Sequence, residues 1–184
     1  MMPTKKLPLF IITGASCVGK SSICKLLFNK EKDYIVMESD ILWSDVYNTP
    51  EDGYKTYRKL WMRLCYNISQ IGLPVVLCGC AIPEQFENNI ERDKFLDIHY
   101  LAVVCDTNVL EERMVNGRKV TDKNWIKSSM DFNNWLKDNA LKTTPSIHLL
   151  DNSQITVEEG SVYVDNWIKN CLSSYAYCFK EDKH

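Results

Sequence analysis

The sequence has no long hydrophobic run and no large excess of charge of either sign. None of its apolar stretches approaches the roughly 18 residues that a membrane-spanning helix requires. The first stretch ends at Ile12, too early for the apolar core of a signal peptide, and no cleavage site follows it. The formal net charge is −2, whereas a dedicated nucleic-acid binder carries a basic face. We therefore expect a cytoplasmic protein without a membrane or nucleic-acid partner.

Patterns typical of zinc sites and disulfide frameworks are also missing. The cysteines include no C-x-x-C pair, and the three histidines show no ligand spacing. Most cysteines fall within apolar strands or on helix faces, where free thiols behave as small buried hydrophobic groups. We therefore expect free thiols at Cys17, Cys24, Cys65, Cys78, Cys80, Cys105, Cys171 and Cys178.

Internal repeats, low-complexity tracts and proline-rich linkers are absent, so residues 1–184 read as one domain. Short, continuously apolar runs, typical of strands buried on both faces of a parallel sheet, lie at 7–13, 34–37, 74–78, 99–105 and 147–150. Helical patterns lie between and after them, at 19–29, 51–71, 84–95, 108–115, 122–140 and 156–172. The last of these opens with a capping box from Thr156 to Glu159. This alternation predicts an α/β fold, and leaves open whether the last dozen residues are docked or frayed.

Glycine is scarce, with seven residues, yet two glycines flank one short loop. Residues 14–21 read Gly-Ala-Ser-Cys-Val-Gly-Lys-Ser, a full match to the phosphate-loop pattern G-x-x-x-x-G-K-S/T. In such a loop the backbone N–H groups face phosphate oxygens, the lysine reaches the β- and γ-phosphates, and the serine hydroxyl binds Mg²⁺. We therefore predict ATP and Mg²⁺ as ligands. The nucleotide-binding residues are expected to be Gly14, Ala15, Ser16, Cys17, Val18, Gly19, Lys20, Ser21 and Ser22, with Lys20 catalytic and Ser21 on the metal.

The motifs of GTP switches and ATP motors are not present. Asp52-Gly53 has the wrong spacing for a GTPase metal motif and no strand before it, and residues 29–32 lack the aspartate of a guanine-binding motif. No predicted strand ends in the paired acids of an ATP motor.

The second predicted strand supplies acidic residues instead. Glu38 and Asp40 are two residues apart, so the alternation of a strand places them on the same side of the chain, beside the phosphate loop. A phosphoryl-transfer enzyme needs a carboxylate there, to hold metal-bound water or to accept the proton of an acceptor hydroxyl. We assign Glu38 to the metal and Asp40 to catalysis and acceptor binding, while the sequence leaves open which lies nearer the metal.

With these residues the chain resembles the small P-loop kinases of the shikimate, gluconate and nucleoside or nucleotide type, over residues 7–172. The resemblance rests on the loop, on the acid at Asp40 and on an arginine-bearing segment after the fourth strand. It implies a five-stranded parallel sheet in the order 2-3-1-4-5, helices on both faces and a short lid. Gly79 matches the small residue that ends strand three in several of these kinases, and we include it among the acceptor-binding residues. The Asp-Gly of nucleoside-monophosphate kinases is absent after strand three, which disfavours adenylate kinase activity.

Arginine is also scarce, with five residues, so its positions are informative. Arg113 and Arg118 flank a segment that the resemblance identifies as the lid, at about 113–124, where arginine meets the transferring phosphoryl group. A planar, permanently charged fork suits that role better than lysine does. We predict that both are catalytic and that Gly117 lets the lid hinge.

The resemblance also implies an acceptor-binding helical region at about 41–72. Arg58 and Arg63 lie in it five positions apart, so they cannot both face one pocket without help, and we expect one of them to line the acceptor site. Trp43, Tyr47 and Trp61 form a candidate apolar wall for an acceptor with a ring, although aromatic residues at helical spacing are more often core.

These observations predict an ATP-dependent kinase that transfers a phosphoryl group to a nucleoside, nucleotide, sugar or similar small molecule. The alternative is a regulatory or partner-binding P-loop ATPase without metabolic kinase activity. We expect a monomer or homodimer whose partners are ATP and the acceptor.

Overall fold

The computed structural model describes residues 6–28, 33–44, 47 and 49–181, and within this range the side chains of 176–181, including Cys178, lie outside the description. The described residues form one five-stranded sheet in the order β2-β3-β1-β4-β5, with every neighbouring pair parallel. The strands are β1 (Leu9–Thr13), β2 (Ile35–Glu38), β3 (Val75–Cys78), β4 (Ile98–Val104) and β5 (Ile147–Asp151). Both the α/β class and the order 2-3-1-4-5 are confirmed.

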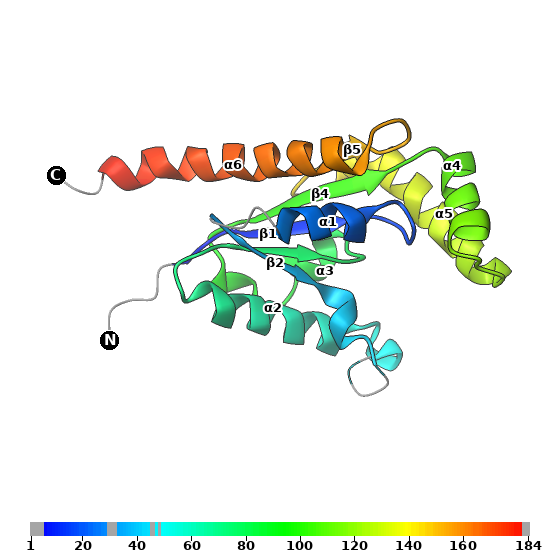
Figure 1. The fold of residues 1–184 in the computed structure, drawn as a ribbon. Coiled ribbons are helices and arrows are strands. Elements are labelled where there is room, and N and C mark those ends of the chain that lie inside the picture. The colour runs from blue at the N-terminus through cyan, green and yellow to red at the C-terminus, as the bar shows by residue number, and fades with distance from the viewer. Residues whose placement is uncertain (1–5, 29–32, 45–46, 48, 182–184) are drawn as a thin grey trace.

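Helices cover both faces of this sheet (Figure 1). They are α1 (Lys20–Phe28), α2 (Lys55–Ser69), α3 (Pro83–Glu87), α4 (Thr107–Glu112), α5 (Lys123–Asn139) and α6 (Val157–Glu181). Alternate residues of β1 point to different cores: Phe10 and Ile12 pack in the core that contains residues of α1 and α6. Leu9 and Ile11 pack in the core that contains residues of α2 and α5. The continuous apolar run in the sequence therefore reflects burial on both faces.

Two predicted helices begin or end differently because of local side-chain and backbone chemistry. The pattern at 51–71 forms α2 only from Lys55, since Gly53 and Tyr54 adopt left-handed angles and Asp52 accepts hydrogen bonds from the backbone of Lys55. The pattern at 84–95 is not one helix but α3 followed by a separate 3₁₀ turn, η3 (Arg92–Lys94). Between them the side chain of Asn89 accepts the backbone N–H of Glu91, a local bond that competes with helix continuation.

The C-terminal helix runs past the predicted end at residue 172 and continues to Glu181. The predicted capping box is present, because Thr156 Oγ1 accepts the N–H of Glu159 and the Glu159 carboxylate accepts the N–H of Thr156. Further along α6 the hydroxyl of Tyr175 donates to Asp97 at 2.7 Å. Tyr175 is therefore docked on the end of the sheet, while residues 182–184 of the predicted tail lie outside the described residues.

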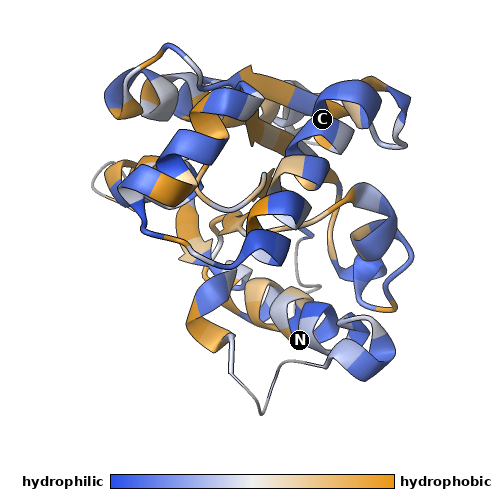
Figure 2. Cartoon of the chain, turned by 90° about the vertical axis from the view of Figure 1, so that its right-hand side faces the viewer, coloured by the Kyte–Doolittle hydropathy of each residue, from blue (hydrophilic) through white to orange (hydrophobic). Residues whose placement is uncertain are grey.

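The carboxyl ends of the parallel strands meet at one edge of the sheet, where ligands bind in open α/β folds. Figure 2 looks onto this edge and shows hydrophobic residues in the central strands and mostly hydrophilic residues on the surrounding helices. Every predicted motif follows one of these strand ends. Among the described residues no helix is long and apolar enough to cross a membrane.

Candidate active site

The phosphate loop joins β1 to α1 in a conformation that requires glycine at both ends. Gly14 and Gly19 have φ angles of 148° and 107°, which side chains rarely adopt. A Cβ atom on Gly14 would lie 2.4 Å from the carbonyl oxygen of Val103, and one on Gly19 would lie 2.5 Å from Nδ2 of Asn152. The loop is therefore fitted tightly between the strand ends of β4 and β5.

A cavity of about 410 Å³, here called the phosphate-loop cavity, lies beside this loop. The side chains of Ala15 and Val18 are buried in the hydrophobic core, and neither these two residues nor Gly14 lines the cavity. Nζ of Lys20 donates to the carbonyl oxygens of Gly14 and Ala15, at 2.7 Å each. The loop residues that line the cavity are Ser16, Cys17, Gly19, Lys20, Ser21 and Ser22.

A hydrogen-bonded clamp joins the loop to the residues after β5 and to the lid. Asn152 is buried, and its Nδ2 donates to the carbonyl oxygen of Val18 at 2.7 Å. The guanidinium of Arg113 donates to the same carbonyl at 3.2 Å and to the carbonyl of Asn152 at 2.8 Å. Arg113 also lines the phosphate-loop cavity, so its charge lies both at the base of the lid and at the loop.

The two predicted acids reach the same cavity from the end of β2. Glu38 is the last residue of β2, and Asp40 lies in the 3₁₀ turn η1 (Ser39–Leu42) that follows it. Both line the phosphate-loop cavity with Lys20 and Ser21. The sheet order explains this proximity, because only β3 separates β2 from the strand that precedes the loop.

The residues of the cavity fit a magnesium ion that is bound together with phosphates. Within the described part of the chain, Oε1 of Glu38 is buried without a hydrogen-bond partner, which is costly for an oxygen that nothing else binds. Ser21 adds an exposed hydroxyl in the first turn of α1. The described residues contain no cluster of three or more metal-binding side chains. Mg²⁺ is commonly bound by one or two protein oxygens and completes its coordination shell with water and phosphates. The Glu38 carboxylate and the Ser21 hydroxyl fit this pattern.

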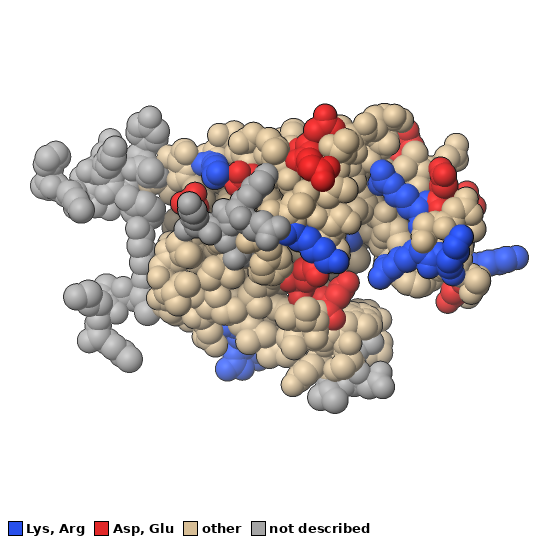
Figure 3. Space-filling model, viewed as in Figure 1, with Lys and Arg blue, Asp and Glu red and all other residues tan. Residues whose placement is uncertain are grey.

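The segment predicted as the lid follows α4 and lies beside the loop. A turn of π-helix (Arg113–Gly117) follows α4, and Arg118 lies just beyond it with its guanidinium 6.0 Å from the ring centre of Trp125. Nε1 of Trp125 donates to the hydroxyl of Ser16 in the loop, at 3.3 Å. Gly117 and Arg118 line the phosphate-loop cavity, and Figure 3 shows Lys and Arg side chains gathered at this end of the molecule.

A second cavity of about 500 Å³, here called the aromatic cavity, adjoins the first. Gly79 and Cys80 line both cavities, so the two meet after the end of β3. Arg58 lines the aromatic cavity, where burial lowers its pKa from the ordinary value. Arg63 does not reach it: its side chain is 60% exposed and lies 3.9 Å from the carboxylate of Glu91. The sequence left open which of the two arginines faces the acceptor, and in the structure Arg58 lines the aromatic cavity while Arg63 does not.

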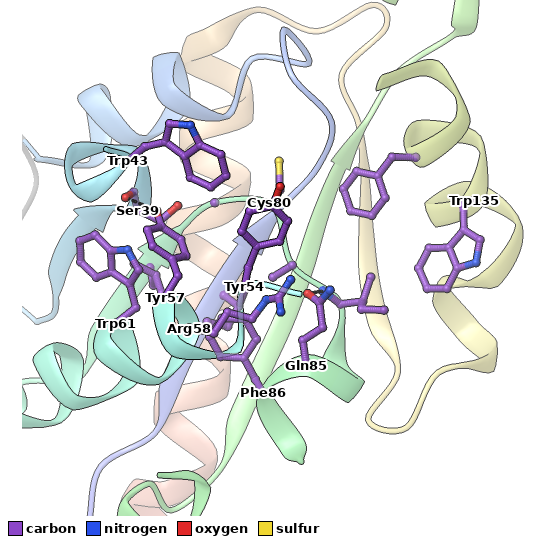
Figure 4. A pocket seen from close by; sticks show the side chains of 16 residues that line it. Ser39, Trp43, Tyr54, Tyr57, Arg58, Trp61, Cys80, Gln85, Phe86 and Trp135 are labelled. Carbon is purple, nitrogen blue, oxygen red and sulfur yellow. Dashed lines mark hydrogen bonds between the residues drawn. The ribbon is translucent and has the colours of Figure 1, made fainter. Parts of the chain in front are cut away.

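The predicted apolar wall is present in part. Trp43 and Trp61 line the aromatic cavity, whereas Tyr47 does not and is 44% exposed. Figure 4 shows Trp43 and Trp61 on the same side of the cavity.

Gly79 is the point where the two cavities and the acidic turn touch. A Cβ atom on Gly79 would lie 2.2 Å from Oγ of Ser39. Ser39 in turn donates from Oγ to Asp40 at 3.4 Å and accepts the hydroxyl of Tyr57 at its carbonyl oxygen. The absence of a side chain at 79 therefore lets the turn that carries Asp40 lie directly against the end of β3.

No protein-family model and no curated protein matches the chain. Solved structures do match. A sugar kinase from Janibacter sp. has a TM-score of 0.59 at 16% identity, covering 90% of this chain and 95% of that chain. A gluconokinase from Sinorhizobium meliloti has a TM-score of 0.58 at 14% identity, covering 98% and 100%. A shikimate kinase from Aquifex aeolicus has a TM-score of 0.52 at 15% identity, covering 90% and 98%.

The chain has the fold of the small P-loop kinases. The resemblance predicted from the loop, the acids and the sheet order is confirmed at the level of fold, which is what similarity at such low identity shows.

Several residues at the site are not apparent from the sequence. Asn152, which lines neither cavity but bonds the phosphate loop, lies in the stretch after the fifth strand, which marks a site edge without indicating a side-chain role.

The other residues line the aromatic cavity. Phe132 and Trp135 are three positions apart on α5, a spacing that also fits a core stripe. Gln85 and Cys80 belong to no motif. Only the sheet topology, which places α3 and α5 around the end of β3, brings these side chains to the aromatic cavity.

Proposed function

We propose that this protein is an ATP-dependent kinase that transfers the γ-phosphoryl group to a hydroxyl of a small molecule. The observation that carries the proposal is the pair of adjoining cavities. One is lined by the phosphate loop, the acids and the lid arginines, and the other is rich in aromatic rings. They share Gly79 and Cys80, next to the turn that carries Asp40. A phosphoryl-transfer site needs this arrangement, with donor and acceptor held in line and in contact.

In this proposal the phosphate-loop cavity holds the triphosphate of ATP. Lys20 exchanges its bonds with the carbonyls of Gly14 and Ala15 for bonds with β- and γ-phosphate oxygens. Ser21 and Glu38 would hold Mg²⁺, which would supply charge neutralisation during transfer. Arg113 and Arg118 add positive charge from the lid side, where charge moves during transfer.

The acceptor enters the aromatic cavity with its hydroxyl directed at Asp40. Asp40 is exposed to the phosphate-loop cavity and orients the hydroxyl or accepts its proton. Closure of the lid, which is followed by Trp125 bonded to Ser16, excludes water that would otherwise accept the phosphoryl group. The neighbours named as sugar kinase, gluconokinase and shikimate kinase support phosphoryl transfer in general and do not identify the acceptor.

The test is ATP turnover across a panel of nucleosides, sugars and aminoglycosides, with Lys20→Ala as the inactive variant. The matched control is Lys169→Ala on α6, which removes a lysine paired with Asp165 and far from both cavities. The proposal predicts that one compound sharply raises ADP release, that Lys20→Ala abolishes this increase and that Lys169→Ala retains it. Slow ADP release that no compound accelerates would instead favour a regulatory or partner-binding ATPase.

A further inference from the structure

The aromatic cavity is a slot between two walls of rings. Seven of its sixteen described lining residues are aromatic. On one wall the ring centre of Trp43 lies 5.5 Å from that of Tyr54 and 5.4 Å from that of Tyr57. On the other wall α5 contributes Phe132 and Trp135, whose stacked rings lie 6.4 Å apart. Figure 4 shows Trp135 across the cavity from Trp43 and Tyr57.

The rings at the mouth of this slot are only partly covered by the protein. Trp43 is 52% exposed and Trp135 is 37% exposed. Burial of such large apolar faces against a ligand is favourable, and a flat ring covers them better than a puckered, hydroxylated one because it also stacks. A volume of about 500 Å³ suits a small molecule with a single ring system and its substituents.

Besides the hydroxyls of Ser39, Tyr54 and Tyr57, which can donate or accept, the main polar side chains of the slot are Arg58 and Gln85, and these present hydrogen-bond donors. Among the described residues no Asp or Glu lines the aromatic cavity. Gln85 already uses Oε1 to accept the N–H of Ile82, which leaves its Nε2 as a donor. Arg58 donates through Nη1 to the carbonyl of Gly53, and the rest of its guanidinium remains available. A polyhydroxylated ligand needs acceptors as well as donors around it, and each buried hydroxyl without a partner weakens binding.

The two donors lie together at the end of the slot away from the phosphate loop. The side chains of Arg58 and Gln85 lie next to each other in Figure 4, and both also line a further, polar cavity. Lys55, Lys59, Glu84 and Asn88 line that polar cavity as well, so polar substituents beyond the ring have space there. The slot thus has a reactive end at Gly79, an apolar middle and an end that donates hydrogen bonds.

We propose that the acceptor is an alcohol carried on a flat, largely apolar ring whose far edge presents oxygen or nitrogen acceptors to Arg58 and Gln85. The inference rests on the proposed kinase function and names its substrate class. The hydroxyl oxygen of the acceptor bonds to the γ-phosphorus while the bond from that phosphorus to the β–γ bridging oxygen breaks. The electron pair of the broken bond stays on ADP, and the hydroxyl proton passes to Asp40 and then to water.

The first experiment compares flat-ring alcohols with puckered polyols, by binding as well as by turnover. The flat compounds are uridine, adenosine and pyridoxine, and the polyols are ribose, gluconate and shikimate. Dihydrouridine, which keeps the oxygens of uridine on a non-planar ring, is the matched control for planarity. Binding is measured by calorimetry on the full-length protein, and turnover by ADP release with ATP and Mg²⁺.

We expect at least one flat compound to bind at least about tenfold more tightly than every polyol, because stacking on aromatic side chains is worth that much. If uridine is that compound, dihydrouridine should bind about tenfold more weakly than uridine. Turnover of polyols without binding of flat compounds overturns the substrate class and leaves the kinase function intact. Tight binding of a flat compound without any turnover supports the substrate class and contradicts the kinase function. No binding of any flat compound overturns the inference.

The second experiment uses variants of the slot. Trp135→Leu removes a ring and Trp135→Phe keeps one, so the first should raise the Kd of the flat compound about tenfold and the second should leave it nearly unchanged. Gln85→Glu keeps the acceptor oxygen for Ile82 but removes the donor, and should weaken binding of ring carbonyls. Tyr163→Leu on α6, which lines neither cavity, is the control for loss of an exposed ring. Equal binding by Trp135→Leu and the unmodified protein would contradict the stacking role.

Discussion

Gly79→Ala is predicted to uncouple ATP binding from phosphoryl transfer. The added Cβ would lie 2.2 Å from Oγ and 3.0 Å from Cβ of Ser39, so Oγ must retreat by more than an ångström to reach the 3.4 Å of ordinary contact. Ser39 is buried, so Oγ has little room to rotate away from the added atom, and the contact with its Cβ stays tight in any rotamer. The turn must therefore shift, and it carries Asp40.

The expected magnitude follows from that displacement. A misplacement of about 1 Å at a reacting group costs roughly a hundredfold in rate. The glycine does not have a positive φ, so the substitution adds no backbone strain of its own. The phosphate loop lies on β1 and keeps its bonds from Lys20, so the Kd of ATP should change by less than about threefold, a shift below 1 kcal/mol.

The assay measures kcat with the best acceptor of the panel and the Kd of ATP by calorimetry, for Gly79→Ala, Ser39→Ala and the double variant. The severe overlap is with Oγ of Ser39, so its removal should restore part of the lost rate in the double variant. If Gly79→Ala keeps full kcat, or if the double variant is no better than the single one, the steric account of Gly79 is wrong.

Three further predictions follow from single contacts. Arg58→Gln should raise the KM of the acceptor about tenfold, whereas Arg63→Gln on the same helix should not change it, and equal effects would show that exposure does not distinguish them. Burial lowers the pKa of His99, so its contribution to stability is present above the ordinary value of about 6.5 and is lost as the pH falls below it. The urea midpoint should therefore drop between pH 7 and 5, and His99→Gln should flatten that drop. Asn152→Ala leaves the carbonyl of Val18 with one donor fewer, and should lower stability by about 1–3 kcal/mol in urea unfolding; an unchanged midpoint would contradict the clamp.

The sheet and the loop could be predicted because their sequence requirements are local. Five apolar runs specify the five strands, of which β1, β3 and β4 are buried almost throughout and the edge strands β2 and β5 only in part. The spacing of Gly14, Gly19 and Lys20 specifies the turn into α1. Asp40 could be predicted for a similar reason. It closely follows a strand, and the resemblance gave the position of that strand in the sheet.

The acceptor side was less predictable because it is assembled from separate elements. Arg58 and Arg63 lie on the same helix, and the sequence pattern does not show which one faces the slot. The structure shows that Arg58 does, on a helix that begins after the left-handed turn at Gly53 and Tyr54. Trp135 reaches the slot from α5, far along the chain, and no local pattern marks it. The end of α3 likewise depends on the side chain of Asn89. Its Oδ1 accepts the N–H of Glu91, and this local bond competes with continuation of a helix that the sequence pattern predicts.

The most direct test of the two-cavity account is ³¹P NMR of a reaction that contains the protein, ATP, Mg²⁺ and the compound that most accelerates ADP release. The account predicts a new phosphomonoester signal that grows in step with ADP, and loss of that signal in Lys20→Ala. A spectrum in which ADP and inorganic phosphate grow together and no phosphomonoester signal appears would contradict it.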